Sequence, residues 1–211
     1  IEVVTQDDIK KYGYRTIDEI LNLSSSISIG SNGGLGQTKS IFLRGTESNH
    51  TKVLLNGVEL NPGTLGVPSI QHISVEMINR IEIAKGGMST LYGRDSIGGV
   101  INIITKRGKG PPKVTAFGEA GSFGTTQAGS SISGGSDDYH YAFNVLKYST
   151  EGISASRPSI SNPEPLEKDG YENFTVSSKL GATPTEDLEV GITGRLIINR
   201  IDLDEVPFPG Q

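Results

Sequence analysis

Residues 91–105 read LYGRDSIGGVINIIT, a loop with three glycines that leads directly into an apolar segment. The apolar segment, residues 100–105, is interrupted only by Asn102 and is shorter than an ordinary helix. Its β-branched residues favour a strand. We therefore expect a glycine-rich loop over 92–99 and a strand over 100–105.

The sequence after this strand marks a domain boundary. Residues 106–113 read KRGKGPPK, and glycine and proline in this density favour a linker. Short helical and strand patterns are mixed before this point, whereas regular alternation dominates after it. We expect a first domain over residues 1–107, a linker over 108–112 and a second domain over 113–211.

The first domain is expected to be of the α+β class. Thr5 with Asp8, and Thr16 with Glu19, have the spacing of a capping box, which begins a helix. Asn56-Gly57 is a two-residue hairpin signal, because both positions of such a turn adopt positive φ. Short helices should therefore extend to about Gly13 and Leu23. Strands are expected over 26–29, 40–43, 52–55, 58–60, 80–84 and 100–105.

The second domain shows a period of two residues. In residues 139–146 the odd positions carry Tyr, Tyr, Phe and Val, and the even positions carry His, Ala, Asn and Leu. Such alternation is typical of strands with two different faces. Five strands fit the pattern, over about 113–121, 125–134, 139–148, 173–182 and 187–197.

The connections between these strands are unequal in length. Residues 135–138 and 183–186 are tight turns, and residues 149–172 form a long loop. Short turns on one side and a long loop on the other are typical of an outer-membrane barrel, although a soluble β-meander gives similar alternation. Five strands are also too few to close a membrane barrel and would leave two open edges. We therefore expect the chain, which stops in the loop-like PFPGQ at 207–211, to be the N-terminal part of a longer polypeptide.

Composition excludes several classes of function. Nineteen basic and 24 acidic residues give a net charge of −5, so no cationic surface indicates nucleic-acid binding. The absence of cysteine excludes disulfides, thiol nucleophiles and zinc–thiolate sites. No apolar run approaches the ~20 residues of a membrane helix. The three histidines lie far apart, and no phosphate-binding, dinucleotide-binding or nucleophile-elbow motif occurs. No catalytic constellation is therefore present, and we expect a protein that is not an enzyme.

Four motifs of the first domain occur together in a fixed order. They are SIFLRG at 40–45, VLLNGV at 53–58, RIEI at 80–83 and LYGRDSIGGVINIIT at 91–105. In this order and spacing they resemble the plug domain of TonB-dependent outer-membrane receptors, over nearly all of residues 1–107. The second domain is then similar to the opening strands of that family's 22-stranded transmembrane β-barrel.

The resemblance implies a receptor of the bacterial outer membrane that binds a large, scarce ligand and imports it with energy from TonB. Within the family, NGGLGQ at 32–37 and RGTESNH at 44–50 most resemble the cobalamin receptors. The expected cargo is therefore cobalamin, with a ferric siderophore or haem as alternatives. A different class, a non-transporting structural component of an outer-membrane assembly, stays open. The expected partners are TonB, the extracellular ligand, outer-membrane lipid and the remaining barrel strands, with no nucleic acid.

The resemblance also assigns roles to residues. Glycine-rich loops suit close approach to a bulky ligand. The loops over 31–39 and 61–67 and the turn over 47–50 are expected to face the extracellular chamber. The expected ligand-binding residues are Asn32, Gly33, Gly34, Leu35, Gly36, Gln37, Ser48, Asn49, His50 and Asn61.

Two further roles follow from the same resemblance. Arg44 and Arg80 should pair with glutamates on the inner barrel wall and lock the plug, and a local Arg80–Glu82 salt bridge is the alternative. Acidic loop residues of the cobalamin receptors hold calcium, and Glu167, Asp169 and Asp204 lie where the resemblance places such ligands. Calcium prefers several carboxylate oxygens as ligands. The alternative is that these acidic residues bind no metal and are ordinary solvent-exposed charges of the loops. No other cofactor is expected.

Overall fold

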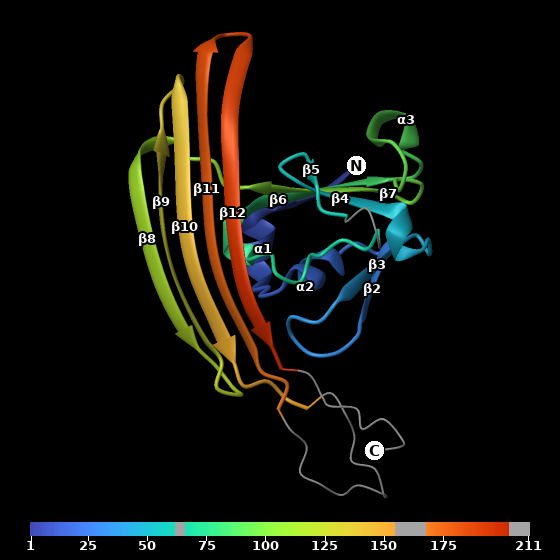
Figure 1. Cartoon of the computed structure of the whole chain (residues 1–211). Helices are drawn as coiled ribbons and strands as arrows, with labels where there is room; N and C mark the ends of the chain where they lie inside the picture. The colour runs from blue at the N-terminus through green and yellow to red at the C-terminus, as the bar shows by residue number, and fades with distance from the viewer. Residues whose placement is uncertain (62–65, 155–167, 203–211) are drawn as a thin grey trace, which may run out of the picture. The chain divides into compact units, whose positions relative to one another are not determined.

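The computed structural model describes residues 1–61, 66–154 and 168–202 (Figure 1). Contacts within the chain divide it into two units. The first joins Ile1–Asn32 to Thr38–Arg107, and the second joins Gly33–Gln37 to Gly108–Gln211. No helix in the described ranges is both long enough and apolar enough to cross a membrane.

The first unit is built on a mixed sheet. Its order among the described residues is β1-β6-β7-β4-β5, with β4 and β7 parallel and the other pairs antiparallel. A separate hairpin pairs the remaining two strands, β2 and β3. The strands are β1 (Glu2–Thr5), β2 (Ile27–Ser31), β3 (Lys39–Leu43), β4 (Thr51–Leu55), β5 (Val58–Glu59), β6 (Ile78–Lys85) and β7 (Gly99–Thr105).

The helices of this unit are short. They are α1 (Gln6–Tyr12), α2 (Ile17–Leu21), α3 (Ser89–Tyr92) and the 3₁₀ helices η1 (Ser48–His50) and η2 (Val75–Met77). The two predicted capping boxes are confirmed. Asp8 Oδ2 accepts the backbone N–H of Thr5 at 3.0 Å, and Glu19 Oε2 accepts that of Thr16 at 3.2 Å. Satisfying these free backbone donors fixes where α1 and α2 begin.

The predicted strands of the first unit are confirmed, with shifts of one or two residues at their ends. The turn between β4 and β5 is also as predicted, since Asn56 has φ +52° and Gly57 has φ +85°. One strand, β1, was missed by the sequence pattern. Four residues next to the chain terminus show no clear period, and Thr5 also serves as the helix cap.

Isoleucine dominates the core of the first unit. Strands β6 and β7 bury Ile81, Ile83, Ile101 and Ile103 completely, and α2 adds Ile20. Each such side chain contributes about 1.5–3 kcal/mol relative to an exposed one. The apolar face of a short helix is therefore held against the sheet by packing more than by intrinsic helix propensity.

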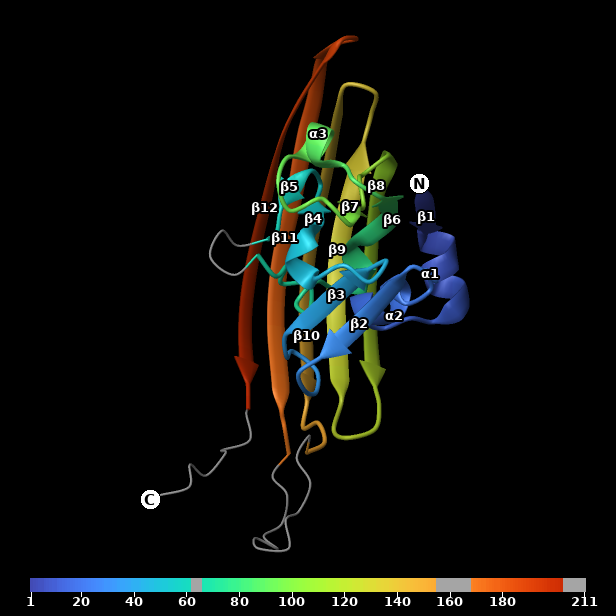
Figure 2. The ribbon, with the colours of Figure 1, turned by 90° about the vertical axis from the view of Figure 1, so that its right-hand side faces the viewer.

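The second unit is an antiparallel meander. In both views the strands lie side by side in chain order (Figures 1 and 2), and the described sheet has the order β12-β11-β10-β9-β8. The five predicted strands are confirmed. They are β8 (Gly110–Ala120), β9 (Thr126–Gly135), β10 (Tyr139–Thr150), β11 (Tyr171–Thr185) and β12 (Leu188–Ile201). Regular pairing of β8 begins at Lys113, after a register shift that follows Gly110.

The predicted two-faced pattern holds along β10. Ala142 and Leu146 are 3% and 8% exposed, whereas Phe143 and Val145 are each 42% exposed. His140, on the same face as Ala142, is also buried. Strand β10 thus presents one apolar, exposed face and one mixed, more buried face, as strands of a membrane barrel do.

Candidate functional site

The glycine-rich segment predicted to bind a ligand is the connection between β2 and β3. The two strands pair up to Ser31 and Lys39, and the backbone N–H of Asn32 donates to the Thr38 carbonyl at 3.2 Å. Within the loop, Gln37 N–H donates to the Gly34 carbonyl at 3.4 Å, and Gly36 has φ +81°. A left-handed residue is cheapest as glycine, so the sequence allows this tight turn.

A buried lysine holds the base of this loop. Lys39 Nζ lies 3.5 Å from Asp18 Oδ2 of α2 and donates a hydrogen bond to Ser31 Oγ at 2.9 Å. The Lys39 side chain is only 10% exposed. The sequence analysis did not predict this role of Lys39. A lysine at an inward position of an otherwise apolar strand is rarely buried without a partner, and that pattern could have indicated a buried ion pair.

The predicted residues Ser48, Asn49 and His50 form η1, but they have different surroundings. Ser48 is buried, and its hydroxyl accepts the backbone N–H of Ile41 at 2.9 Å. Asn49 is exposed and His50 is half-buried. Ser48 therefore fixes the turn to β3, which leaves Asn49 and His50 as the members with accessible side chains.

Asn61 is held by three hydrogen bonds to the backbone. Its Nδ2 donates to the carbonyls of Thr51 at 3.1 Å and Gly66 at 2.7 Å, and its Oδ1 accepts the Val53 N–H at 2.8 Å. Both amide hydrogens are thereby used inside the protein. Gly66 has φ +67°, and a Cβ placed on it would lie 3.0 Å from Asn49 Cβ. The structure thus brings Asn61 close to the turn that carries Asn49.

The two arginines of the predicted lock differ in their surroundings. Arg80 Nε lies 2.7 Å from Glu82 Oε1 on β6, which is the local pair named above as the alternative. Arg44 is exposed, has φ +56° and is followed by Gly45 at φ +76°. No ion pair of Arg44 occurs among the described residues.

The predicted calcium ligands are only partly within the structure. Glu167 and Asp204 lie outside the described residues. Asp169 is buried, and its backbone N–H donates to the Ile153 carbonyl at 3.4 Å. The described ranges contain no group of three or more His, Cys, Asp or Glu residues placed to hold a metal ion.

Sequence reasoning also missed a second buried lysine, which ties two loops of the first unit together. Lys52 Nζ donates to the Tyr92 carbonyl at 2.8 Å and to Glu59 Oε2 at 3.1 Å. Its side chain is 9% exposed. These two hydrogen bonds hold the end of α3, at Tyr92, against the β4–β5 hairpin.

The comparisons with known proteins agree with this geometry. The model of the TonB-dependent Receptor Plug Domain family matches residues 1–100. Over 210 residues the chain is 34% identical to the vitamin B12 transporter BtuB of Photobacterium profundum, covering 97% of this chain and 33% of the relative. Residues 1–100 are a plug domain of the TonB-dependent receptors. These receptors are outer-membrane proteins and not enzymes, and the predicted location and fold class are confirmed.

Solved structures of other TonB-dependent receptors share the fold. The ferric yersiniabactin uptake receptor FyuA of Yersinia pestis is similar with a TM-score of 0.73 and 21% identity, over 94% of this chain and 31% of that chain. The siderophore receptor PirA of Acinetobacter baumannii gives a TM-score of 0.70 and 22% identity, over 94% and 31%. The chain spans about a third of the length of these relatives.

Proposed function

We propose that this chain is part of a TonB-dependent importer whose cargo is cobalamin. The observation that carries the proposal is the 34% identity to a vitamin B12 transporter, which extends over 97% of the chain and therefore over both units. The siderophore receptors are similar in fold at 22% identity or less, and this level of identity does not indicate a shared cargo.

The local geometry of the loops supports binding of a bulky ligand. The β2–β3 loop carries Leu35, which is 37% exposed, and Asn32, whose polar side chain is also exposed. Asn49 supplies an exposed amide on η1, which Ser48 and Asn61 fix in place. A large ligand with both apolar and hydrogen-bonding edges, such as a corrinoid, requires this mixture of contacts.

TonB is the proposed energy-coupling partner, because the family as a whole is named for its dependence on this protein. Calcium is a proposed organiser of the ligand site. Within the described residues the proposal rests on Asp169, a buried carboxyl close to the end of the long loop. Carboxylate oxygens are the ligands that calcium prefers. Calorimetric titrations of the receptor with cobalamin, with and without calcium, test this role, and equal affinities would exclude it.

Titration calorimetry of the full-length receptor tests the cargo. Cobalamin should bind tightly, and a ferric siderophore and haem should not. Asn32→Ala combined with Leu35→Ala should weaken cobalamin binding by roughly tenfold, the effect of losing one or two good contacts. Asn22→Ala, at the exposed end of α2, is the matched control and should bind like the parent. Tight siderophore binding without cobalamin binding would contradict the cargo while leaving the family unchanged.

A further inference from the structure

The tip of the β2–β3 loop, Gly33–Gln37, belongs to the second unit. Contacts within the chain group it with Gly108–Gln211, although β2 and β3 themselves lie in the first unit. Within the loop tip Gly36 is buried, whereas the preceding Leu35 is 37% exposed. One residue of the loop tip is therefore turned into the protein and its neighbour is turned out of it.

The residue that covers Gly36 is Tyr171, the first residue of β11. A Cβ placed on Gly36 would lie 2.5 Å from Tyr171 Cε2 and still closer to Cδ2. The aromatic ring thus fills the space beside the Gly36 backbone, and Tyr171 is itself only 6% exposed. Such a close approach of a ring to the backbone requires glycine, as does the φ of +81° at the same position. Gly36 is therefore an anchor point of the loop tip.

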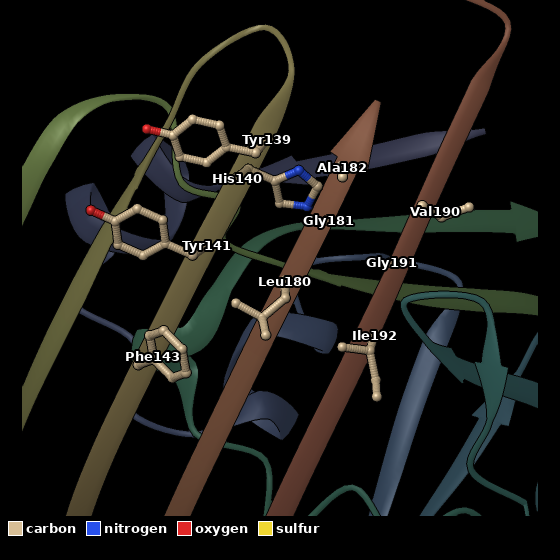
Figure 3. A pocket seen from close by; sticks show the side chains of 10 residues that line it. All are labelled: Tyr139, His140, Tyr141, Phe143, Leu180, Gly181, Ala182, Val190, Gly191 and Ile192. Atoms are coloured by element: carbon tan, nitrogen blue, oxygen red, sulfur yellow. The ribbon is translucent and has the colours of Figure 1, made fainter. Parts of the chain in front are cut away.

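Tyr171 lies on the interior face of the β10–β11 pair. Tyr141 and its register partner Leu180 extend from one side of the sheet together with Phe143 (Figure 3). Leu180 and Phe143 are 41% and 42% exposed, as expected of the lipid-facing side of a membrane barrel. Tyr171 is an odd number of positions from Leu180 along β11, so it points to the opposite side. Tyr171 therefore belongs to the face that lines the inside of such a barrel.

The surroundings of Tyr171 are fixed by several contacts. The ring of Tyr148 lies beside it on β10, with 5.9 Å between the ring centroids. Thr150 is the register partner of Tyr171, and its hydroxyl donates to the Phe123 carbonyl at 3.2 Å. The same hydroxyl lies 2.8 Å from Thr125 Oγ1. The β8–β9 turn is thereby tied to β10 at the level of Tyr171, so the ring that covers the loop tip has a fixed support.

We propose that Tyr171 is a positioning residue for cargo binding, because it holds the loop tip in the conformation that presents Leu35 and Asn32. The proposal rests on the proposed function, in which these two side chains contact the cargo. Tyr171 acts through the loop tip and not through a contact of its own with the cargo. Without the ring, a segment that contains three glycines regains conformational freedom, and ordering it again on binding costs affinity.

Titration calorimetry of the full-length receptor with cobalamin measures this effect on binding. Tyr171→Ala should weaken binding by roughly tenfold, which corresponds to ordering about one freed residue. Tyr171→Phe keeps the ring and should bind like the parent. Phe117→Ala is the matched control, because Phe117 lies on the same face of the sheet but packs against Gly129 of β9. Parent-like affinity of Tyr171→Ala would overturn the proposal.

Gly36→Ala tests the same contact from the loop and leaves the barrel strand intact. Its Cβ would displace the Tyr171 ring, so binding should weaken to a similar extent. Gly13→Ala is the control for backbone strain alone, since Gly13 has φ +68° and no atom lies within 4 Å of its added Cβ. Because both substitutions break one contact, Gly36→Ala with Tyr171→Ala should bind no more weakly than the weaker single variant. Additive losses would overturn the proposal.

Hydrogen exchange of the receptor without cargo separates the role of Tyr171 from the identity of the cargo. The amide of Gln37, which donates to the Gly34 carbonyl, should exchange roughly tenfold faster in Tyr171→Ala than in the parent. It should exchange at the parent rate in Tyr171→Phe and Phe117→Ala. A receptor that binds no cobalamin would contradict the proposed cargo, and the exchange rates would still decide the role of Tyr171. Equal exchange in Tyr171→Ala and the parent would overturn the proposal.

Discussion

Arg80 and Glu82 form an ion pair along β6, with 2.7 Å between Arg80 Nε and Glu82 Oε1. Their side chains are 41% and 33% exposed, so water screens the pair and it contributes about 0–1 kcal/mol on its own. Glu82 also accepts a long hydrogen bond of 3.5 Å from Asn102 Nδ2 on β7. The pair therefore orients the guanidinium more than it stabilises the sheet.

Substitution of both arginines tests whether they lock the plug in the full-length receptor. We expect Arg44→Met with Arg80→Met to lower the free energy of unfolding of the plug by about 3–5 kcal/mol, because their partner carboxylates would be left buried without counter-charges. Differential scanning calorimetry should show an earlier plug transition. Glu82→Gln is the control, and it should cost less than about 1 kcal/mol. Equal, small effects of Arg80→Met and Glu82→Gln would reject the lock in favour of the local pair.

Replacement of Asn61 should destabilise the first unit. Asn61→Ala removes three hydrogen bonds and leaves the carbonyls of Thr51 and Gly66 and the N–H of Val53 without their partner. Loss of partners for partly buried backbone groups costs about 1–3 kcal/mol. Asn49→Ala, an exposed asparagine nearby, should change the urea midpoint only slightly. A midpoint for Asn61→Ala equal to that of Asn49→Ala would contradict this assignment.

Gly99 is a position where only glycine fits. Its φ is +148°, and a Cβ there would lie 2.3 Å from the Ala84 carbonyl oxygen and 2.5 Å from Leu43 Cδ2. Gly99→Ala should therefore lower stability by about 2–4 kcal/mol through backbone strain and displacement of β6. Gly34→Ala is the matched control, since no atom lies within 4 Å of its added Cβ. Chemical denaturation that gives the two variants the same midpoint would refute the steric argument.

Local signals in the sequence predicted the fold because each has a direct physical cause. The capping boxes, the Asn56-Gly57 turn and the alternation along β10 all depend on residues close together in the chain. The roles of Lys39 and Lys52 depend on partners brought together only by tertiary packing, such as Asp18 for Lys39. The same is true of Asn61. The sequence predicts it as a ligand contact, and in the structure its side chain hydrogen-bonds to the backbone carbonyls of Thr51 and Gly66.

The stability of the first unit should depend on the charge of Glu2. Glu2 Oε2 accepts hydrogen bonds from Lys85 Nζ and Ser24 Oγ, each at 2.7 Å, so the carboxylate ties β1 to β6 and to the segment before β2. These contacts, Lys85 first and then Ser24, lower the pKa of Glu2 below its ordinary value of 4.5. A carboxyl with a lowered folded-state pKa contributes its stabilisation fully above the unfolded pKa and loses it as the pH falls through the folded one.

Urea denaturation at a series of pH values measures this contribution. The parent should lose stability as the pH falls below about 4.5, and Glu2→Gln should remove a part of that loss equal to less than about 1 kcal/mol, since the side chain is one-third exposed. Lys85→Met should flatten the profile in the same range, because it removes the largest cause of the shift. The double variant should then add nothing to either single one. Additive effects of the two substitutions would show that Glu2 and Lys85 act independently, and the pair would not be the source of the acid sensitivity.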